Sequence, residues 1–302
     1  MRAYRMYQVD SFTKEKLLGN PAGVVTNADG LSETEMQMIA RELNNSETAF
    51  ILSPTDHTHD VWVRFFTPLN EVPVCGHATI AAHYVRAFEK RLGTTRVLQK
   101  TGAGVLPVDI LKDGDDYRIV MTQGRVEFGD TITGEALQAL LAALGINGEA
   151  LRPNCPVQIA STGHGKVMVG LRDGGLLNRL EPDMGLLKKA GEAVGCKGFY
   201  VFTLHPEERY AVRGRMFAPA IGIPEDPVTG NANGPLGAYL VRYGLLPLIS
   251  GELRFTALQG EAVRRPGTVE VSVKTKGGKP VEVQITGNAT IAFATTLLLD
   301  ER

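Results

Sequence analysis

The stretch EDPVTGNANGPLGAYLV, from Glu225 to Val241, echoes EVPVCGHATIAAHYV, which begins at Glu71. Both fit E-x-P-V-x-G-x-A, and both continue into an apolar segment of about three helical turns. The similarity extends upstream, because R-x-F-x-P precedes each copy, at Arg64 and at Arg215. A period of about 150 residues is too long for a solenoid, so the pattern indicates duplication of a whole domain. Two unrelated turns that share only their Gly and Pro residues would not match at so many positions.

The length of the chain agrees with a duplication. A single hydrophobic core rarely grows beyond about 250–300 residues, so 302 residues predict two domains. We expect an N-terminal domain over residues 1–125, completed by a C-terminal strand within 286–302. We expect residues 126–285 to form a pseudo-repeat of it.

Composition and charge exclude several classes of protein. Hydrophobic content of 43% and charged content of 22% are ordinary for a globular domain. A net charge of -1 gives no electrostatic reason to expect nucleic acid or an anionic membrane as a partner. The sequence shows no signal peptide and no apolar span of 18 residues. Three cysteines without C-x-x-C spacing suit free thiols in a reducing cytoplasm, so we expect a cytoplasmic protein.

The pattern of elements predicts an α+β fold. Strands outnumber helices, which favours mostly antiparallel sheets over a doubly wound parallel sheet. The segments 77–92 and 232–243 are apolar on nearly every side, Phe88 included, as is typical of buried helices. We therefore predict two pseudo-symmetric domains, each a curled sheet around its own central helix. Pro235 is expected in the first turn of its helix, where its missing N–H costs little.

Each repeat places a glycine-bearing turn, at Gly76 or Gly230, before its buried helix. The start of a helix carries unpaired N–H groups and about half a positive charge, so it attracts an anion. Neither turn is a Walker loop, and no G-x-G-x-x-G follows a strand. Two such ends facing one cleft between the domains would hold a small carboxylate.

Four segments together resemble the phenazine biosynthesis PhzF-like proteins, which have the diaminopimelate epimerase fold. They are GNPAGVV at 19–25, SETAF at 46–50, CGHAT at 75–79 and EDPVTG at 225–230. They occur in the family's order over essentially the whole chain. The resemblance implies an active site between two similar domains, no cofactor, and often a homodimer. The resemblance also implies a substrate like trans-2,3-dihydro-3-hydroxyanthranilate, on which characterised members of the family act.

The resemblance also implies the residues of the site. It gives Glu47 as the acid/base and His77 and Asp226 as supporting catalytic residues. The expected substrate-binding residues are Asn20, Cys75, Gly76, Ala78, Gly230, Asn231 and Ala232.

The residues themselves leave alternatives open for the three catalytic candidates. Glu47 opens an apolar strand, where a rim carboxylate or a backbone cap is the simpler interpretation. His77 lies in the first turn of a buried helix, where the dipole disfavours its cationic form, so it could exchange a proton or simply hydrogen-bond. Asp226 precedes a proline and a helix, so it could equally be a helix-capping acid.

The two repeats differ at the residue before the motif glycine. This residue is Cys75 before Gly76 and Thr229 before Gly230. The chain also resembles the thiol-based racemases of this fold, which have a cysteine at both of these positions. A threonine hydroxyl is far too weak an acid for that task, so a two-thiol epimerase is disfavoured. We expect an isomerase of a small cyclic or amino-acid-like carboxylate in which Glu47 moves a proton between carbons.

Other functions and sites were weighed against this one. The alternatives are an amino- or hydroxy-acid epimerase that uses Cys75 with Glu47, and a binding protein that has lost turnover. No ligand cluster has credible metal spacing, so no metal is expected. The roles of Cys75 and of His164, in a glycine-rich turn, stay open.

Overall fold

The computed structural model describes residues 1–300, and the chain forms two compact units. Unit 1 comprises Met1–Thr122 and the segment from Thr286 onward, and unit 2 comprises Gln123–Ile285. No helix among the described residues is both long and apolar enough to span a membrane.

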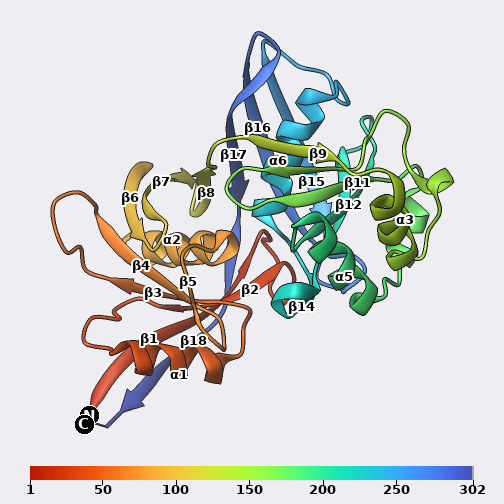
Figure 1. Cartoon of the computed structure of the whole chain (residues 1–302). Helices are drawn as coiled ribbons and strands as arrows, with labels where there is room; N and C mark the ends of the chain where they lie inside the picture. Colours follow the sequence, from red (N-terminus) through yellow and green to blue (C-terminus); the bar gives the residue numbers. More distant parts are fainter. Residues whose placement is uncertain (301–302) are drawn as a thin grey trace. The chain divides into compact units, whose positions relative to one another are not determined.

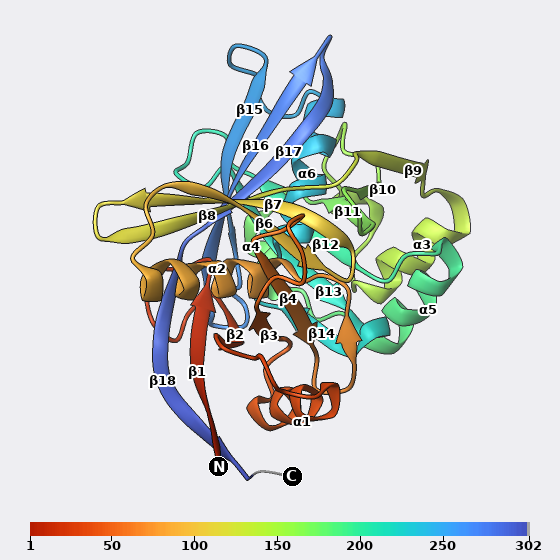
Figure 2. The same ribbon diagram turned by 90° about the vertical axis from the view of Figure 1, so that its left-hand side faces the viewer.

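The sheet of unit 1 is mostly antiparallel. Its strands follow the order β18-β1-β2-β3-β4-β6-β7-β8, and β5 pairs with β4. Among the described strands of this unit, only the pairs β2–β3 and β4–β6 are parallel. The first and last strands of the chain lie side by side, as Figures 1 and 2 show. The strands are β1 (Arg2–Ser11), β2 (Asn20–Val25), β3 (Thr48–Leu52), β4 (Val61–Phe66), β5 (Glu71–Val72), β6 (Thr95–Thr101), β7 (Gly104–Asp113), β8 (Asp116–Thr122) and β18 (Ala289–Leu299).

The sheet of unit 2 repeats this pattern. Its strands follow the order β9-β10-β11-β12-β13-β15-β16-β17, β14 pairs with β13, and β11–β12 and β13–β15 are parallel. The strands are β9 (Glu127–Thr131), β10 (Gln158–Ser161), β11 (Lys166–Gly170), β12 (Phe199–Leu204), β13 (Val212–Ala218), β14 (Ile223–Asp226), β15 (Glu252–Gln259), β16 (Gly267–Lys276) and β17 (Lys279–Gly287).

The helices occupy matching places in the two units. In each unit a helical segment connects the first pair of parallel strands (β2–β3 or β11–β12), and another helix follows the short strand that carries the E-x-P-V motif. Unit 2 has further helices, of which α3 packs against α5. The predicted α+β fold with two pseudo-symmetric halves is therefore confirmed. The helices are α1 (Glu33–Leu43), α2 (Gly76–Lys90), α3 (Gly134–Ala143), α4 (Gly174–Arg179), α5 (Met184–Val194) and α6 (Gly230–Arg242), with 3₁₀ turns at Gly148–Ala150 and Pro219–Ile221.

Helices α2 and α6 are the buried helices that the sequence predicts. Ten of the fifteen residues of α2 are buried, and it packs on strands of unit 1 that include β1, β2, β3 and β8. Helix α6 is buried along nearly its whole length and packs on β10, β11, β15 and β16. The prediction for Pro235 is wrong, because α6 begins at Gly230 and the proline lies inside the helix. Its missing N–H leaves the carbonyl of Asn231 without the usual helical donor.

The repeated arginine and glutamate form the same ion pair in both units. Arg64 on β4 holds Glu71 on β5 through two contacts of 2.7 Å. Arg215 on β13 holds Glu225 on β14 at 2.9 and 2.7 Å. Each guanidinium also lies over the phenylalanine of its own R-x-F motif. The shared motif therefore fixes the short strand that leads into each buried helix.

His83 makes the stability of unit 1 depend on pH. Its side chain is fully buried in α2, and its Nε2 lies 2.8 Å from Gln99 Oε1. Burial lowers the pKa of His83 from 6.5 to about 4. Between these values the unfolded chain binds a proton that the folded protein does not, so stability falls as the pH drops from 6.5 to 4.

We expect this histidine to remove about 3 kcal/mol of unfolding free energy over that range, from about 1.4 kcal/mol per pKa unit. The measurement is denaturant unfolding at several pH values for the wild type and for His83→Leu. The wild type should lose more stability on acidification than the variant does. Parallel pH profiles would show that His83 does not carry this dependence.

Candidate functional site

Glu47, Cys75 and His77 meet in unit 1. Glu47 Oε2 lies 3.4 Å from His77 Nε2, and Cys75 Sγ lies 3.4 Å from His77 Nδ1. The imidazole thus stands between a carboxylate and a thiol. All three side chains are shielded, since the side chain of Glu47 is 14% exposed and that of His77 is 7% exposed.

Hydrogen bonds at the start of α2 fix His77. Ser11 Oγ donates to the His77 carbonyl at 2.8 Å, and Thr79 Oγ1 donates to the Cys75 carbonyl at 2.6 Å. Ser46 Oγ lies 3.2 Å from His77 Nε2, on the side where Glu47 approaches. In contrast, buried Glu47 Oε2 makes no hydrogen bond among the described residues. This oxygen is therefore available to accept a proton or a ligand hydrogen bond.

The segment GNPAGVV at 19–25, which contains Asn20, begins with a tight turn in unit 1. Gly19 has a φ of +61°, and a Cβ there would lie 2.2 Å from the Ser11 carbonyl oxygen. Only glycine fits this position. Asn20 follows as the first residue of β2, is buried, and pairs in register with Ser11 of β1.

Asp226 lies at the centre of a polar network in unit 2. The Thr229 hydroxyl donates to Asp226 Oδ2, and Gln259 Nε2 donates to the Asp226 carbonyl at 2.8 Å. Gln259 Oε1 accepts from the Thr229 N–H at 3.1 Å and from Asn233 Nδ2 at 3.2 Å. Tyr200 donates to Asn233 Oδ1 at 2.8 Å. Thr229, not Asp226, is the N-cap residue of α6, so a simple helix-capping role for Asp226 is excluded.

The predicted carboxylate-binding residues form the first turns of α2 and α6. Cys75 and Thr229 are the N-cap residues, and neither side chain makes a capping hydrogen bond. The N–H groups of such a first turn keep their affinity for an anion. The residues that follow the caps are Gly76, His77 and Ala78 in unit 1 and Gly230, half-buried Asn231 and Ala232 in unit 2. That both turns serve one substrate stays a prediction.

The sequence prediction overlooked a set of possible metal ligands. Glu47, Cys75 and His77 offer donor atoms within 4.8 Å of one another, and zinc accepts all three ligand types. However, the carboxylate faces one ring nitrogen of His77 and the thiol faces the other. An imidazole binds a metal through one nitrogen at about 2.0–2.1 Å, so an ion held by all three residues would lie beside only one of these two ring nitrogens.

Sequence reasoning missed the residues that support Asp226. Gln259 ends β15, and Asn233 lies one residue beyond the predicted substrate-binding turn. The only signal was polarity, because both residues interrupt otherwise apolar buried segments. His164 lies exposed in the turn before β11, and no hydrogen bond or ion pair among the described residues links it to Asp226.

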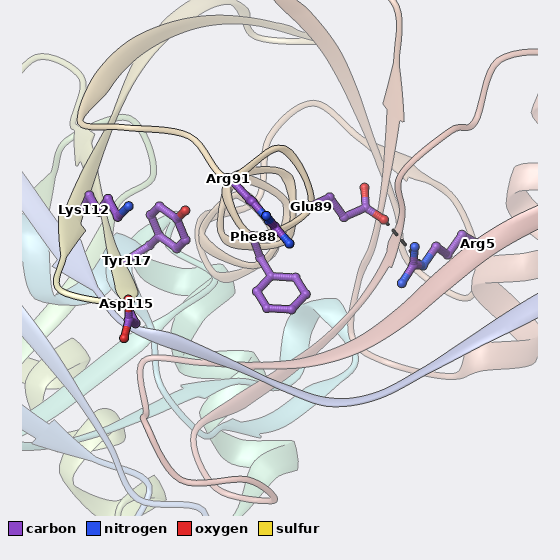
Figure 3. Close-up of a pocket in the computed structure, with 7 residues that line it drawn as sticks. All are labelled: Arg5, Phe88, Glu89, Arg91, Lys112, Asp115 and Tyr117. Carbon is purple, nitrogen blue, oxygen red and sulfur yellow. Dashed lines mark ion pairs between the residues drawn. The ribbon is translucent and has the colours of Figure 1, made fainter.

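A pocket of about 680 Å³ lies elsewhere in unit 1 (Figure 3). It includes Phe88, whose side chain is 52% exposed, so the expectation that Phe88 is buried is wrong. Phe88 and Glu89 lie at the end of α2, about 17 Å along the helix from His77. Arg5 pairs with Glu89 at 3.6 Å across this pocket. Its lining mixes both signs of charge and contains none of the predicted catalytic residues.

Comparisons with known proteins identify the family of this chain. The family model for phenazine biosynthesis-like proteins (PhzC-PhzF) matches residues 9–295. An uncharacterized isomerase from Clostridium acetobutylicum is 57% identical, over 99% of this chain and 100% of the relative. A trans-2,3-dihydro-3-hydroxyanthranilate isomerase from Pseudomonas aeruginosa is 32% identical, over 96% of this chain and 98% of its own length.

Solved structures give the same result for the fold. A PhzF-family phenazine biosynthesis protein from Bacillus anthracis superposes with a TM-score of 0.87 at 29% identity, over 99% of this chain and 100% of the other. A hydroxyproline epimerase from Agrobacterium vitis shares the fold alone, with a TM-score of 0.65 at 14% identity, over 99% of this chain and 94% of the other. The prediction of a PhzF-like isomerase is confirmed, and the chain belongs to the family of phenazine biosynthesis-like proteins.

Proposed function

We propose that this isomerase moves a proton between carbons of a small cyclic amino carboxylate, with Glu47 as the general acid/base and without a cofactor. The observation that carries the proposal is the shielded Glu47 Oε2, which has no hydrogen bond among the described residues and lies 3.4 Å from His77 Nε2. A general base needs a free lone pair beside the proton that it removes. Glu71 and Glu225, the glutamates of the repeated motif, are instead paired with Arg64 and Arg215.

The other residues take roles that follow from their chemistry. His77 can donate from Nε2 to Glu47 or to a substrate oxygen as charge develops. The uncapped first turn of α2 offers N–H groups to a substrate carboxylate. Asp226 accepts from the Thr229 hydroxyl and offers negative charge to a substrate amine.

A thiol-based epimerase is the second candidate, and one contact favours it. Cys75 Sγ lies 3.4 Å from His77 Nδ1, which is the arrangement of a thiol activated by an imidazole. An epimerase also needs an acid on the opposite face of the carbon. At the corresponding place in unit 2, Thr229 already donates its hydroxyl proton to Asp226. The lack of a second thiol there is the reason for preferring Glu47.

The first test is turnover of trans-2,3-dihydro-3-hydroxyanthranilate, the substrate named for the Pseudomonas aeruginosa relative, alongside cyclic amino acids and in the presence of a chelator. We expect isomerisation of a compound of this class, at a rate that the chelator does not change. Activity that a chelator abolishes and a divalent ion restores would contradict the cofactor-free mechanism. Saturable binding without conversion of any compound would instead identify a binding protein.

The homodimer that the resemblance implies is also part of the proposal. The mass of the protein in solution, measured by light scattering after gel filtration, checks it.

A further inference from the structure

Lys166 lies close to Asp226 in unit 2 but does not pair with it. Lys166 begins β11, and its side chain is only partly exposed. Its Nζ contacts the carbonyls of Gly165 at 3.3 Å and His164 at 3.5 Å. It makes no ion pair within 4.0 Å among the described residues, although the Asp226 carboxylate is close enough to favour its charged form.

The register of the sheet explains why this lysine points toward Asp226. Met168, Tyr200, Met216 and Asp226 lie in one row across β11, β12, β13 and β14. Lys166 is two residues before Met168 and Gly198 is two before Tyr200, so they lie on the same face of the sheet as this row.

Gly198 opens the path for the lysine side chain. A Cβ on Gly198 would lie 2.6 Å from Lys166 Cδ and 2.6 Å from Met216 Cε. The lysine chain therefore passes over Gly198, the residue before β12, and approaches Met216, whose partner in the register is Asp226.

The surroundings of Lys166 destabilise the charged form of its side chain. Burial lowers the pKa of Lys166, and the Asp226 carboxylate opposes part of that effect. An ammonium has three donors, and the Nζ of Lys166 donates to two carbonyls at the long distances of 3.5 and 3.3 Å. A partly buried cation in this position is stabilised by an anion that approaches it.

We propose that Lys166 is a specificity-determining residue that binds the carboxylate of the substrate, together with the N–H groups at the start of α2, while Asp226 binds the neighbouring amino group. This inference rests on the proposed function, because it names the groups of the same substrate. The two side chains carry opposite charges on the same face of this sheet, which suits a ligand that carries an amino group and a carboxylate on adjacent carbons. Such a ligand pairs with both charges at once, whereas a simple amine pairs with only one.

The test compares two ligands by calorimetry, 3-hydroxyanthranilate and 2-aminophenol, which differ only in the carboxylate. The wild type should prefer 3-hydroxyanthranilate. Lys166→Met should weaken binding of 3-hydroxyanthranilate by at least about tenfold, as expected for loss of a charge-assisted hydrogen bond, and change 2-aminophenol less than about twofold. Gly198→Ala keeps the charge but obstructs the path of the side chain, so it should reduce the same preference. Gly198 does not have a positive φ, so alanine fits its backbone.

Lys197→Met is the matched control, because it removes the same charge from an exposed residue next to Gly198. It should leave the affinity for both ligands unchanged. Equal losses for the two ligands in Lys166→Met, no loss for either, or a wild type without preference for the carboxylate would each overturn the inference. Failure of the proposed function looks different, because Glu47→Gln would then keep its turnover while the effect of Lys166 on the carboxylate persists.

Discussion

Glu47→Gln should lower turnover by at least about a hundredfold, the low end for loss of a positioned acid/base. Glutamine keeps the size of the side chain but has no basic oxygen at the position of Oε2. Ligand affinity should stay within an order of magnitude, because the expected binding groups are at the starts of α2 and α6. Steady-state kinetics and calorimetry on the same preparation measure both quantities.

Cys75→Ser is the control, since the thiol lies at the same distance from the other nitrogen of His77. On the Glu47 mechanism it should have a much milder effect on turnover. His77→Ala should fall between the two, because His77 contacts both side chains. Near-normal turnover in Glu47→Gln, together with an inactive Cys75→Ser, would establish the thiol-based alternative.

Arg215→Met should destabilise the protein by about 3–5 kcal/mol, the usual cost of removing one partner from a buried ion pair. The side chains of Arg215 and Glu225 are 8% and 10% exposed. Arg215 also donates to the carbonyls of Leu177 at 3.0 Å and Leu180 at 2.7 Å. The variant therefore leaves a buried carboxylate and two carbonyls without their donor. Urea unfolding of the purified variant measures the loss.

The duplication supplies a matched control in Arg64→Met. Arg64 holds Glu71 and Glu33 in the same way, but these carboxylates are 37% and 71% exposed and can be hydrated once the arginine is gone. We expect a loss of about 1 kcal/mol, typical of exposed pairs. The double variant Arg215→Met/Glu225→Met should recover part of the loss, because no buried charge is left alone. Equal losses for the two single variants would contradict the role of burial.

The sequence predicts the repeat and the buried helices because both depend on local patterns. Gly, Pro and the apolar positions recur with fixed spacing in each copy, and the structure places α2 and α6 where these positions indicate. The predicted start of α6, at residue 232, is two residues after the observed start at Gly230. The prediction used Pro235 as a sign of a helix boundary, but the helix begins one turn earlier and continues through the proline.

The site is less accessible to sequence reasoning because its contacts join distant positions. The resemblance supplied Glu47 and His77, but nothing in their spacing shows that they lie 3.4 Å apart. For the same reason the sequence did not predict the possible metal ligands Glu47, Cys75 and His77. Gln259 carries no motif at all, and only the pairing of β13 with β15 brings it to Asp226.

The central claim is that the enzyme moves a proton from one carbon to another. Turnover of trans-2,3-dihydro-3-hydroxyanthranilate in deuterium oxide, followed by NMR, tests it most directly. We predict a product with shifted double bonds whose new hydrogen, from the solvent or from the substrate, is on a different carbon from the one that lost its proton. The recovered substrate should keep its configuration. Deuterium found only at the original stereocentre, with that centre inverted, would contradict the account and identify an epimerase.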